Sequence, residues 1–405
     1  MGQSTFPVPS SGSSTSTVLP VNASSVILDG SLTSASTYTT TVNGNGGIAY
    51  LTATDNPATI TVGGTAYSVP ANSTVATTAV VGSGVSTTIA ASGFAQTAPA
   101  TFTASTMPSG GSSAGWTGVT YGNGYYVAVA QTTTAGAYST NGTSWTASTM
   151  PSAVTWTGVT YGNGYYVAIA YGTTAGAYST NGTTWTASTM PSASGWNAVG
   201  YGNGYFVAVA YVATAGAYST NGTSWTASTM PSASGWTGVT YGNGYYVAIA
   251  YGTTAGAYST NGTTWTASTM PSSSKWNSVT YGLVGSTPTY VAVAGGPTTA
   301  GAYSTNGSTW TASTMPSSSA WYGVTYGNGY FVAVSNGSTA GAYSSNGITW
   351  TASTLPSSSQ WYSVTYGNGK FVAVQQSLTT AGAYYAFSPA LPVNFGIYAG
   401  PTTIN

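Results

Sequence analysis

The chain has 405 residues, and only four of them carry a formal charge: Asp29, Asp55, Lys275 and Lys370. It contains no Glu, Arg, His or Cys, whereas an average domain carries about a quarter charged residues. The two carboxylates, Asp29 and Asp55, both lie within the first 55 residues, so the rest of the chain cannot hold a catalytic pair. The residues for a hydrolytic triad or a zinc site are missing, and two lysines cannot neutralise a nucleic-acid backbone. From composition alone we expect no enzyme, no metal ion or other cofactor, and no nucleic-acid partner.

The rest of the composition indicates folded structure. Hydrophobic residues make up 42% of the chain, which has 33 Tyr and 13 Trp, whereas disordered chains are poor in both classes. No run of about 18 apolar residues is present, so no membrane insertion is expected. Because a net charge near zero leaves little repulsion between molecules, we expect the protein to be part of an oligomeric assembly.

The first 98 residues divide into two segments. Residues 1–20 are rich in Ser, Thr and Pro, which is typical of a flexible or extended arm. Residues 21–98 contain short β-branched runs separated by turn residues, and Gly63-Gly64 marks a hairpin between two of them. This pattern predicts a small all-β, sandwich-like domain. Its candidate strands are Ser25–Leu28, Thr37–Val42, Ile48–Thr54, Thr59–Val62, Thr65–Val69, Val75–Val81 and Val85–Ala90.

A sequence repeat follows this domain. The pattern Trp-x-x-Val-x-Tyr-Gly occurs seven times at spacings of 40 or 45 residues, and in six copies a second Trp follows 29 or 34 residues later. Such a period indicates an array of identical structural units. The first tryptophans are Trp116, Trp156, Trp196, Trp236, Trp276, Trp321 and Trp361. The second are Trp145, Trp185, Trp225, Trp265, Trp310 and Trp350.

Each copy of the repeat predicts four short strands. Asn123-Gly124 and Asn141-Gly142 are two-residue signals for type I′ hairpins. No segment shows the 3.6-residue apolar period of a helix. Four antiparallel strands in about 40 residues are typical of one blade of a β-propeller. In the first copy the strands cover Trp116–Tyr121, Tyr125–Ala130, Gly136–Thr140 and Ser144–Thr149.

The last copy lacks its fourth strand, and a matching strand lies before the first copy. Phe102–Pro108 repeats Trp145–Pro151 in every residue but the first. We therefore predict an all-β chain in which residues 99–392 form a seven-bladed β-propeller, with strand 102–108 closing the last blade and removing a free edge. The degenerate copy Phe387–Pro392 is the alternative closing strand. Residues 393–405 remain as a C-terminal tail.

The repeat resembles a known group of proteins. The segments Tyr-Gly-Asn-Gly-Tyr-Phe-Val-Ala-Val and Ala-Tyr-Ser-Thr-Asn-Gly-Thr-Thr-Trp are similar to repeats of phage virion and tail-fibre proteins with Asp-box-like β-propellers. They also resemble, more distantly, the Asp box of sialidases. Asn141 and its equivalents stand where Asp is usual, and the box is one residue short. The resemblance implies a structural role for the box and a binding propeller rather than a hydrolase.

The same resemblance implies a function and a place. The implied function is that of a non-enzymatic virion structural protein, either a phage tail fibre or a capsid decoration. The implied place is the extracellular surface of the virus particle. Residues 1–98 would anchor it to other virion proteins, and the propeller would face outward as a binding head. From the loop residues that follow the second strands, we expect adhesion to a neutral glycan of the host surface. The alternative is a secreted cellular surface adhesin or sheath component.

Candidate binding residues follow the second strand of each copy, where otherwise near-identical repeats differ most. Loops on a rigid scaffold commonly carry binding, so we expect tyrosines there to stack on sugar rings and amides to bind hydroxyl groups. The alternative is that these are solvated loops without function. For the first tryptophans, packing between blades is favoured over a stacking role at the channel mouth. The candidate residues are Gln131, Tyr171, Tyr211, Tyr251, Asn336 and Gln375.

Overall fold

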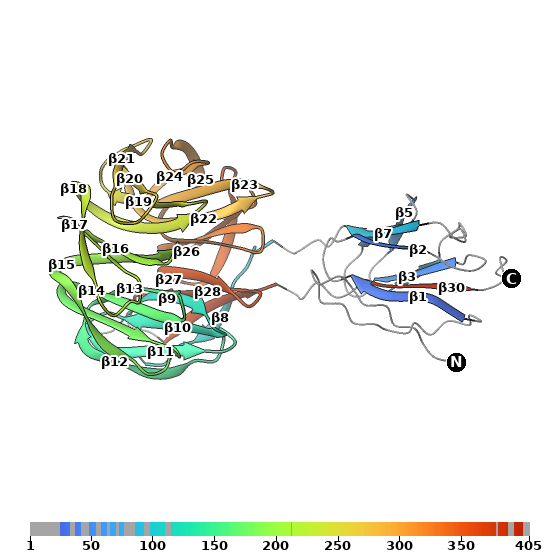
Figure 1. Cartoon of the computed structure of the whole chain (residues 1–405), viewed down its shortest axis with the longest axis horizontal. Coiled ribbons are helices and arrows are strands. Elements are labelled where there is room, and N and C mark those ends of the chain that lie inside the picture. The colour runs from blue at the N-terminus through green and yellow to red at the C-terminus, as the bar shows by residue number, and fades with distance from the viewer. Residues whose placement is uncertain are drawn as a thin grey trace. The chain divides into compact units, whose positions relative to one another are not determined.

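The computed structural model describes residues 98–387, apart from 110–114, 212 and 378–379, together with eight strands that lie outside this range. The chain divides into two units, of which one is Ala98–Ala386 and the other combines Met1–Thr97 with Phe387–Asn405. The described part is built of antiparallel strands and contains no helix (Figure 1). It therefore has no helix long and apolar enough to cross a membrane. The predicted arm, residues 1–20, lies outside the described residues.

The two-part unit contains two four-stranded antiparallel sheets. The first has the order β1 (Ser25–Leu32), β30 (Val393–Ala399), β3 (Ile48–Ala53) and β6 (Ser73–Ala76). The second has the order β2 (Thr37–Thr41), β7 (Ser86–Ser92), β4 (Ala58–Val62) and β5 (Thr65–Val69). All seven candidate strands before residue 98 therefore correspond to strands, although the expected extension of β6 to Val81 lies outside the described residues.

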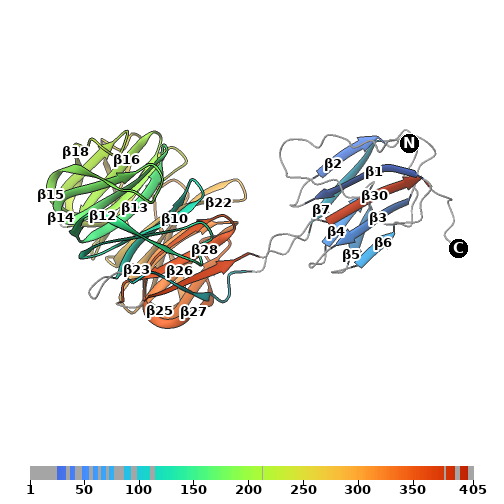
Figure 2. The ribbon, with the colours of Figure 1, turned by 90° about the horizontal axis from the view of Figure 1, so that it is seen from below.

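The C-terminal segment is not a separate tail, which corrects the expectation from sequence. β30 lies between β1 and β3, with Asp29 opposite Gly396 and Leu51 opposite Phe395 (Figure 2). The two ends of the chain thus build one sheet. The physical reason is that without β30 the strand β1 would have no partner and β3 would have one unpaired backbone edge, and β30 pairs with both.

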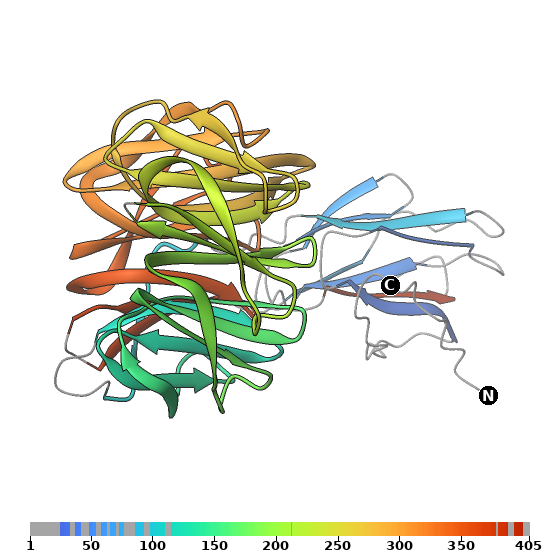
Figure 3. The same cartoon turned by 60° about the vertical axis from the view of Figure 1, so that its left-hand side comes forward.

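The second unit consists of seven copies of the repeat, here called repeats 1 to 7 and beginning at the seven first tryptophans (Figure 3). Some strands run without a break from the outermost strand of one repeat into the innermost strand of the next. Its strands are β8 (Thr103–Thr106), β9 (Trp116–Gly122), β10 (Tyr125–Ala130), β11 (Thr133–Ser139), β12 (Thr146–Val154), β13 (Trp156–Gly162), β14 (Tyr165–Ser179), β15 (Thr186–Gly202), β16 (Tyr205–Tyr211), β17 (Ala213–Ser219), β18 (Thr226–Gly242), β19 (Tyr245–Tyr251), β20 (Ala255–Ser259), β21 (Thr266–Thr269), β22 (Lys275–Val284), β23 (Thr287–Gly295), β24 (Thr298–Ser304), β25 (Thr311–Gly327), β26 (Tyr330–Ser344), β27 (Thr351–Gly367), β28 (Lys370–Gln375) and β29 (Ala381–Ala386).

Repeat 1 shows how the sequence sets the local structure. β9, β10, β11 and β12 form one antiparallel sheet in this spatial order, with Tyr126 opposite both Tyr121 and Ser139. β10 is buried on both faces from Tyr126 to Ala130, because neighbouring repeats cover the two sides of the sheet. This explains its continuous apolar sequence, which differs from the alternation of a half-buried strand.

The two Asn-Gly turns of a repeat differ in conformation. Asn123 and Gly124 have φ values of 42° and 83°, as the predicted type I′ turn requires. In the second turn only Gly142, with φ of 72°, has a positive φ, so the prediction of a second type I′ hairpin is wrong. The Asn141 side chain explains the difference, because its Oδ1 accepts hydrogen bonds from the backbone N–H groups of Thr143 (2.9 Å) and Ser144 (2.8 Å).

Successive repeats contact each other through a glycine and a tyrosine. A Cβ atom built on Gly122 of repeat 1 would lie 2.0 Å from the ring of Tyr161 in repeat 2, so only glycine fits there. The same contact joins repeat 7 to repeat 1 through Gly367 and Tyr121, which makes the array a closed ring. The intervening pairs are Gly162–Tyr201, Gly202–Tyr241, Gly242–Tyr281, Gly282–Tyr326 and Gly327–Tyr366.

The fourth strand of repeat 7 comes from the N-terminal side of the ring. β8 pairs with β29, with Thr106 opposite Ala381 and Tyr384 opposite Thr103. Backbone hydrogen bonds from Phe102 N to Thr354 O (2.8 Å) and from Thr354 N to Ala100 O (2.9 Å) extend the seam to repeat 6. Residues 388–392 of the alternative closing strand lie outside the described residues. The closed ring of four-stranded sheets is the arrangement of a β-propeller.

Candidate binding face and central cavity

Five of the six candidate residues after the second strand share one structural position, and Gln375 is the exception. Each of the five lies beside the residue that precedes the first Trp of a repeat. Gln131 N donates to Gly115 O (3.0 Å), Tyr171 N donates to Thr155 O (2.9 Å), and Tyr251 is opposite Gly235. The equivalent residues in repeats 1 to 7 are Gln131, Tyr171, Tyr211, Tyr251, Gly295, Asn336 and Gln376.

Tyr171, Tyr211 and Tyr251, here called the rim tyrosines, keep different amounts of exposed surface. Tyr171 is 48% exposed, and its ring lies against Gly195, where an added Cβ would be only 2.9 Å from it. The half-buried Tyr211 covers Gly235 in the same way. Glycines before the first Trp therefore hold these rings, and Tyr171 keeps the largest area for a ligand.

Tyr211 and Tyr251 form an edge-to-face pair, and a lysine accompanies them. Their ring centroids are 6.0 Å apart at an interplanar angle of 67°. The Nζ atom of Lys275 lies 5.6 Å from the centroid of Tyr251. Lys275 is exposed, and its ammonium group stands over an aromatic face.

The amide residues are placed less uniformly than expected. Asn336 is half-buried, between Ala320 and Gln360 on the neighbouring strands. Gln375 was expected on the surface, but it is fully buried opposite Trp361, where repeats 1 to 5 have Ala. Gln376 occupies the rim position instead, and its Nε2 donates to Gln131 Oε1 (2.9 Å) across the junction of repeats 7 and 1.

The first tryptophans have a packing role. All seven are fully buried, and six donate their Nε1–H to the backbone carbonyl four residues earlier, as Trp196 does to Ser192 (2.9 Å). They therefore contribute no surface at the channel mouth, and the stacking role is excluded by their burial.

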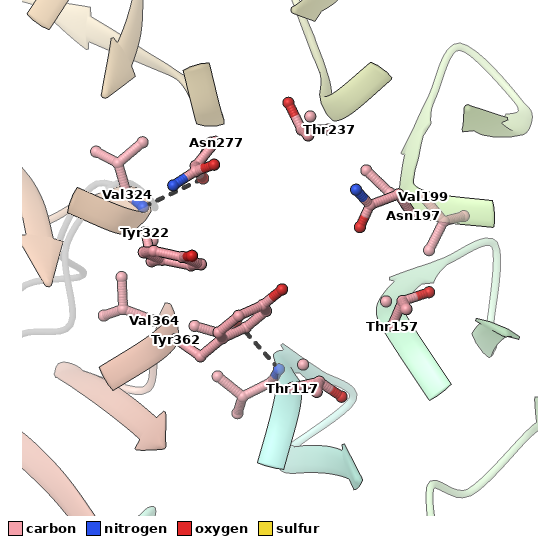
Figure 4. Close-up of a pocket in the computed structure, with 18 of the residues that line it drawn as sticks. Thr117, Thr157, Asn197, Val199, Thr237, Asn277, Tyr322, Val324, Tyr362 and Val364 are labelled. Atoms are coloured by element: carbon pink, nitrogen blue, oxygen red, sulfur yellow. Dashed lines mark hydrogen bonds between the residues drawn. The ribbon is translucent and has the colours of Figure 1, made fainter. Parts of the chain in front are cut away.

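A cavity of about 200 Å³ lies at the centre of the ring (Figure 4). It is lined by the three residues that follow the first Trp in all seven repeats. None of these residues carries a charge. The sequence analysis did not identify this site.

The residue directly after the first Trp gives the cavity its chemistry. In most repeats its side chain bridges to the next inner strand. Thr117 Oγ1 donates to Trp156 O (2.5 Å), Thr237 Oγ1 to Trp276 O (2.6 Å), and Asn277 Nδ2 to Trp321 O (3.0 Å). In repeats 1 to 7 this residue is Thr117, Thr157, Asn197, Thr237, Asn277, Tyr322 and Tyr362. Its variation among similar repeats is the sequence signal from which the cavity could have been found.

Tyr322 and Tyr362 lie side by side in the cavity, with ring centroids 5.0 Å apart (Figure 4). Burial, together with the neighbouring Tyr322 hydroxyl, raises the pKa of Tyr362 to about 12. Burial also raises the pKa of Tyr322, the nearby Tyr251 and Tyr211 hydroxyls raise it further, and Lys275 opposes this shift. The strand register places the rim tyrosines beside the cavity, since Tyr211 and Tyr251 are opposite Gly195 and Gly235, each two residues before a cavity-lining residue.

No protein-family model matches the sequence, and no curated protein does. Solved structures share its fold. A virginiamycin B lyase from Staphylococcus aureus has a TM-score of 0.63 at 11% identity and covers 71% of this chain and 100% of its own. A streptogramin B lyase reaches 0.62 at 12% identity, with 70% and 97% covered. YCF48 from Cyanidioschyzon merolae reaches 0.53 at 13% identity, with 72% and 99% covered. At these identities the likeness shows the fold alone.

These comparisons correct the expectation that the chain is no enzyme. Two of the similar structures are lyases, so the fold of this chain is one that carries catalysis in other proteins. Missing residue types exclude particular mechanisms, such as a histidine-dependent triad, but they do not exclude catalysis as a class. Among the described residues, no group of three or more His, Cys, Asp or Glu side chains is present that could hold a metal ion.

Proposed function

We propose that this chain is a virion surface protein, a phage tail fibre or a capsid decoration, whose seven-bladed β-propeller binds a neutral glycan of the host surface. The strands of the two-part unit, as a small sandwich-like domain, attach it to other virion proteins. The protein acts at the extracellular face of the particle as part of an oligomeric assembly.

One observation carries this proposal. The seven repeats differ at several positions, and two of these, the residue after the first Trp and the rim position, occur near one end of the inner strands. A rigid scaffold that varies a set of aromatic and amide side chains on one face is suited to recognition. The described part of this face has one cation, Lys275, and no carboxylate, which favours an uncharged ligand.

The place of the protein is tested by imaging. Purified particles are labelled with an antibody raised against residues 98–386, and the label is located by electron microscopy. Label at tail or fibre tips supports host adhesion, and label spread over the capsid supports a decoration role. Absence of label from every particle would contradict the proposal and favour a secreted cellular adhesin.

The binding face is tested by variants. Tyr171→Ala, Tyr211→Ala and Tyr251→Ala are combined in one chain, and adsorption to host cells is measured. We expect a loss of about tenfold or more, because truncating aromatic anchors that a bound ligand covers costs at least about 1–2 kcal/mol. The matched control is the triple Ala variant of Thr186, Thr226 and Thr266, which are exposed in the outer strands of the same three repeats. Unchanged adsorption of the tyrosine variant would rule out this face.

A further inference from the structure

The cavity residues divide into those that hold the ring together and those that do not. Thr117, Thr157, Thr237 and Asn277 each donate a hydrogen bond to the carbonyl of the next repeat's first Trp, at 2.5 to 3.0 Å. Ser278 and Ser363 accept hydrogen bonds from the N–H groups of Val324 (3.2 Å) and Val119 (3.3 Å). These side chains have a structural role that would be lost if they turned towards a ligand.

Three side chains depart from this pattern. Within the described part of the chain, the Asn197 amide and the hydroxyl groups of Tyr322 and Tyr362 make no hydrogen bond to protein atoms. Figure 4 shows Asn197 across the cavity from the two tyrosines. Repeat 3 lies half a turn of a seven-membered ring away from the junction of repeats 6 and 7, so this opposition follows from the repeat positions themselves.

The chemistry of this constellation is specific. Two phenol rings give a stacking surface, and the phenol hydroxyls and one amide give hydrogen-bond donors and acceptors of fixed position. No charged residue lines the cavity, and burial keeps the phenol of Tyr362 protonated with a pKa of about 12. A volume of about 200 Å³ is below the roughly 300–1,000 Å³ of sites that enclose a whole drug-sized ligand. The fitting ligand is therefore one uncharged ring that carries hydroxyl groups.

We propose that the central cavity binds the terminal sugar ring of a neutral glycan, held between the tyrosine pair Tyr322–Tyr362 and Asn197. The ring stacks on the tyrosines, and its hydroxyl groups bond to the Asn197 amide. This inference deepens the proposed function and rests on it, since it names the subsite that reads the end of the glycan.

The rim continues the cavity in one direction. Tyr211 is opposite Gly195, two residues before the cavity-lining Asn197, and Tyr251 is opposite Gly235, two residues before the cavity-lining Thr237. The rings of Tyr211 and Tyr251 contact each other, with centroids 6.0 Å apart. A glycan whose terminal ring occupies the cavity thus has an aromatic surface for its next rings. The rim tyrosines belong to repeats 2 to 4 and therefore lie on the Asn197 side, opposite the tyrosine pair of repeats 6 and 7.

The test uses the full chain and four probes, the methyl glycosides of glucose, galactose, mannose and N-acetylglucosamine. Binding is measured by saturation-transfer NMR and by titration calorimetry. The first variant combines Tyr322→Thr and Tyr362→Thr, and the second is Asn197→Thr. Both introduce the residue that repeats 1, 2 and 4 carry at this position, so the fold has a precedent within the chain. The rim triple Ala variant and the Thr186, Thr226 and Thr266 triple Ala variant serve as comparisons.

We expect at least one glycoside to bind, and its affinity to fall about tenfold or more in the double variant and about threefold or more in the Asn197 variant. Binding that survives both variants but is lost in the rim variant would overturn the cavity proposal and leave host adhesion intact. If the unmodified chain binds none of the four glycosides, the cavity proposal is also overturned. The host-adhesion proposal is then decided separately by the cell-adsorption assay. Affinity that no variant changes counts equally against the cavity.

Discussion

The ring of Tyr121 occupies the space that a side chain on Gly367 would need, with a separation of 2.0 Å between the ring and a Cβ built there. These two residues are 246 positions apart in the sequence, yet their contact has the same geometry as the contact between Gly122 and Tyr161 in adjacent repeats. The closure of the ring is therefore built from the same parts as its interior.

Replacing Gly367 by Ala should destabilise the ring by about 1–3 kcal/mol, because the new methyl group forces the Tyr121 ring to move. Gly158→Ala is the control, since a Cβ there has only ordinary contacts, at 3.4 Å and beyond. Urea unfolding of both variants measures the free energy of unfolding. Equal stability of the two variants would contradict the role assigned to the Gly367–Tyr121 contact.

The second turn of each repeat should depend on an amide oxygen rather than on a charge. Asn221 Oδ1 accepts hydrogen bonds from the N–H groups of Thr223 and Ser224, both at 3.0 Å. Asn221→Ala removes these acceptors and is expected to cost about 1–2 kcal/mol. Asn221→Asp keeps an acceptor in place and should lose little. Thermal unfolding compares the two, and a larger loss for the Asp variant would show that the turn is held by something else.

Alkaline pH should weaken the fold, and acid should matter little. Tyr362 has a pKa of about 12 in the folded chain, against about 10 when unfolded. Its contribution is fully present below about pH 10 and is lost as the pH rises towards 12, because the unfolded chain releases its proton first. Denaturation midpoints from pH 5 to 12 should be flat to about pH 9 and then fall. Tyr362→Phe should show a shallower fall; an identical profile would contradict the assignment.

Deleting residues 393–405 should unfold one unit and spare the other. β30 lies between β1 and β3, so its removal leaves both of these strands without a partner on one side. The ring of repeats makes no strand pair with β30. Limited proteolysis of the shortened chain should cleave within residues 25–92 and leave a resistant fragment that contains residues 98–386. Protection of residues 25–92 equal to that in the full chain would refute this.

The sequence predicts the strands of the repeat well, since Asn-Gly turns and buried apolar runs are local signals. It does not separate the turn at Asn123 from the turn at Asn141, because the same dipeptide adopts two conformations depending on which groups the asparagine side chain reaches. It also misplaces the rim residue of repeat 7, where two successive glutamines make the register ambiguous and Gln375 proves to be buried. Local patterns cannot resolve either case.

The cavity was missed for a different reason. Asn197, Tyr322 and Tyr362 are separated by 40 to 165 positions, and only the closed ring brings them to one place. Their variation was visible in the sequence, but it had no meaning until the inner strands were known to surround a common axis. Sites of this kind follow from topology rather than from a motif.

The position of β30 has a consequence for synthesis on the ribosome. β3 ends at Ala53 and its partner begins at Val393, so the whole ring is made between them. At about 5–20 residues per second, β3 waits on the order of 20–70 s for its neighbour. The ring can complete its own sheets once β29 has emerged from the ribosome. The segment before the ring then starts from β8 and the segment after it starts from β29, and these two strands are paired. This spatial closeness lowers the entropy that β30 must lose to find β1 and β3. Folding of the ring thus brings two segments of the nascent chain that are distant in sequence close together in space.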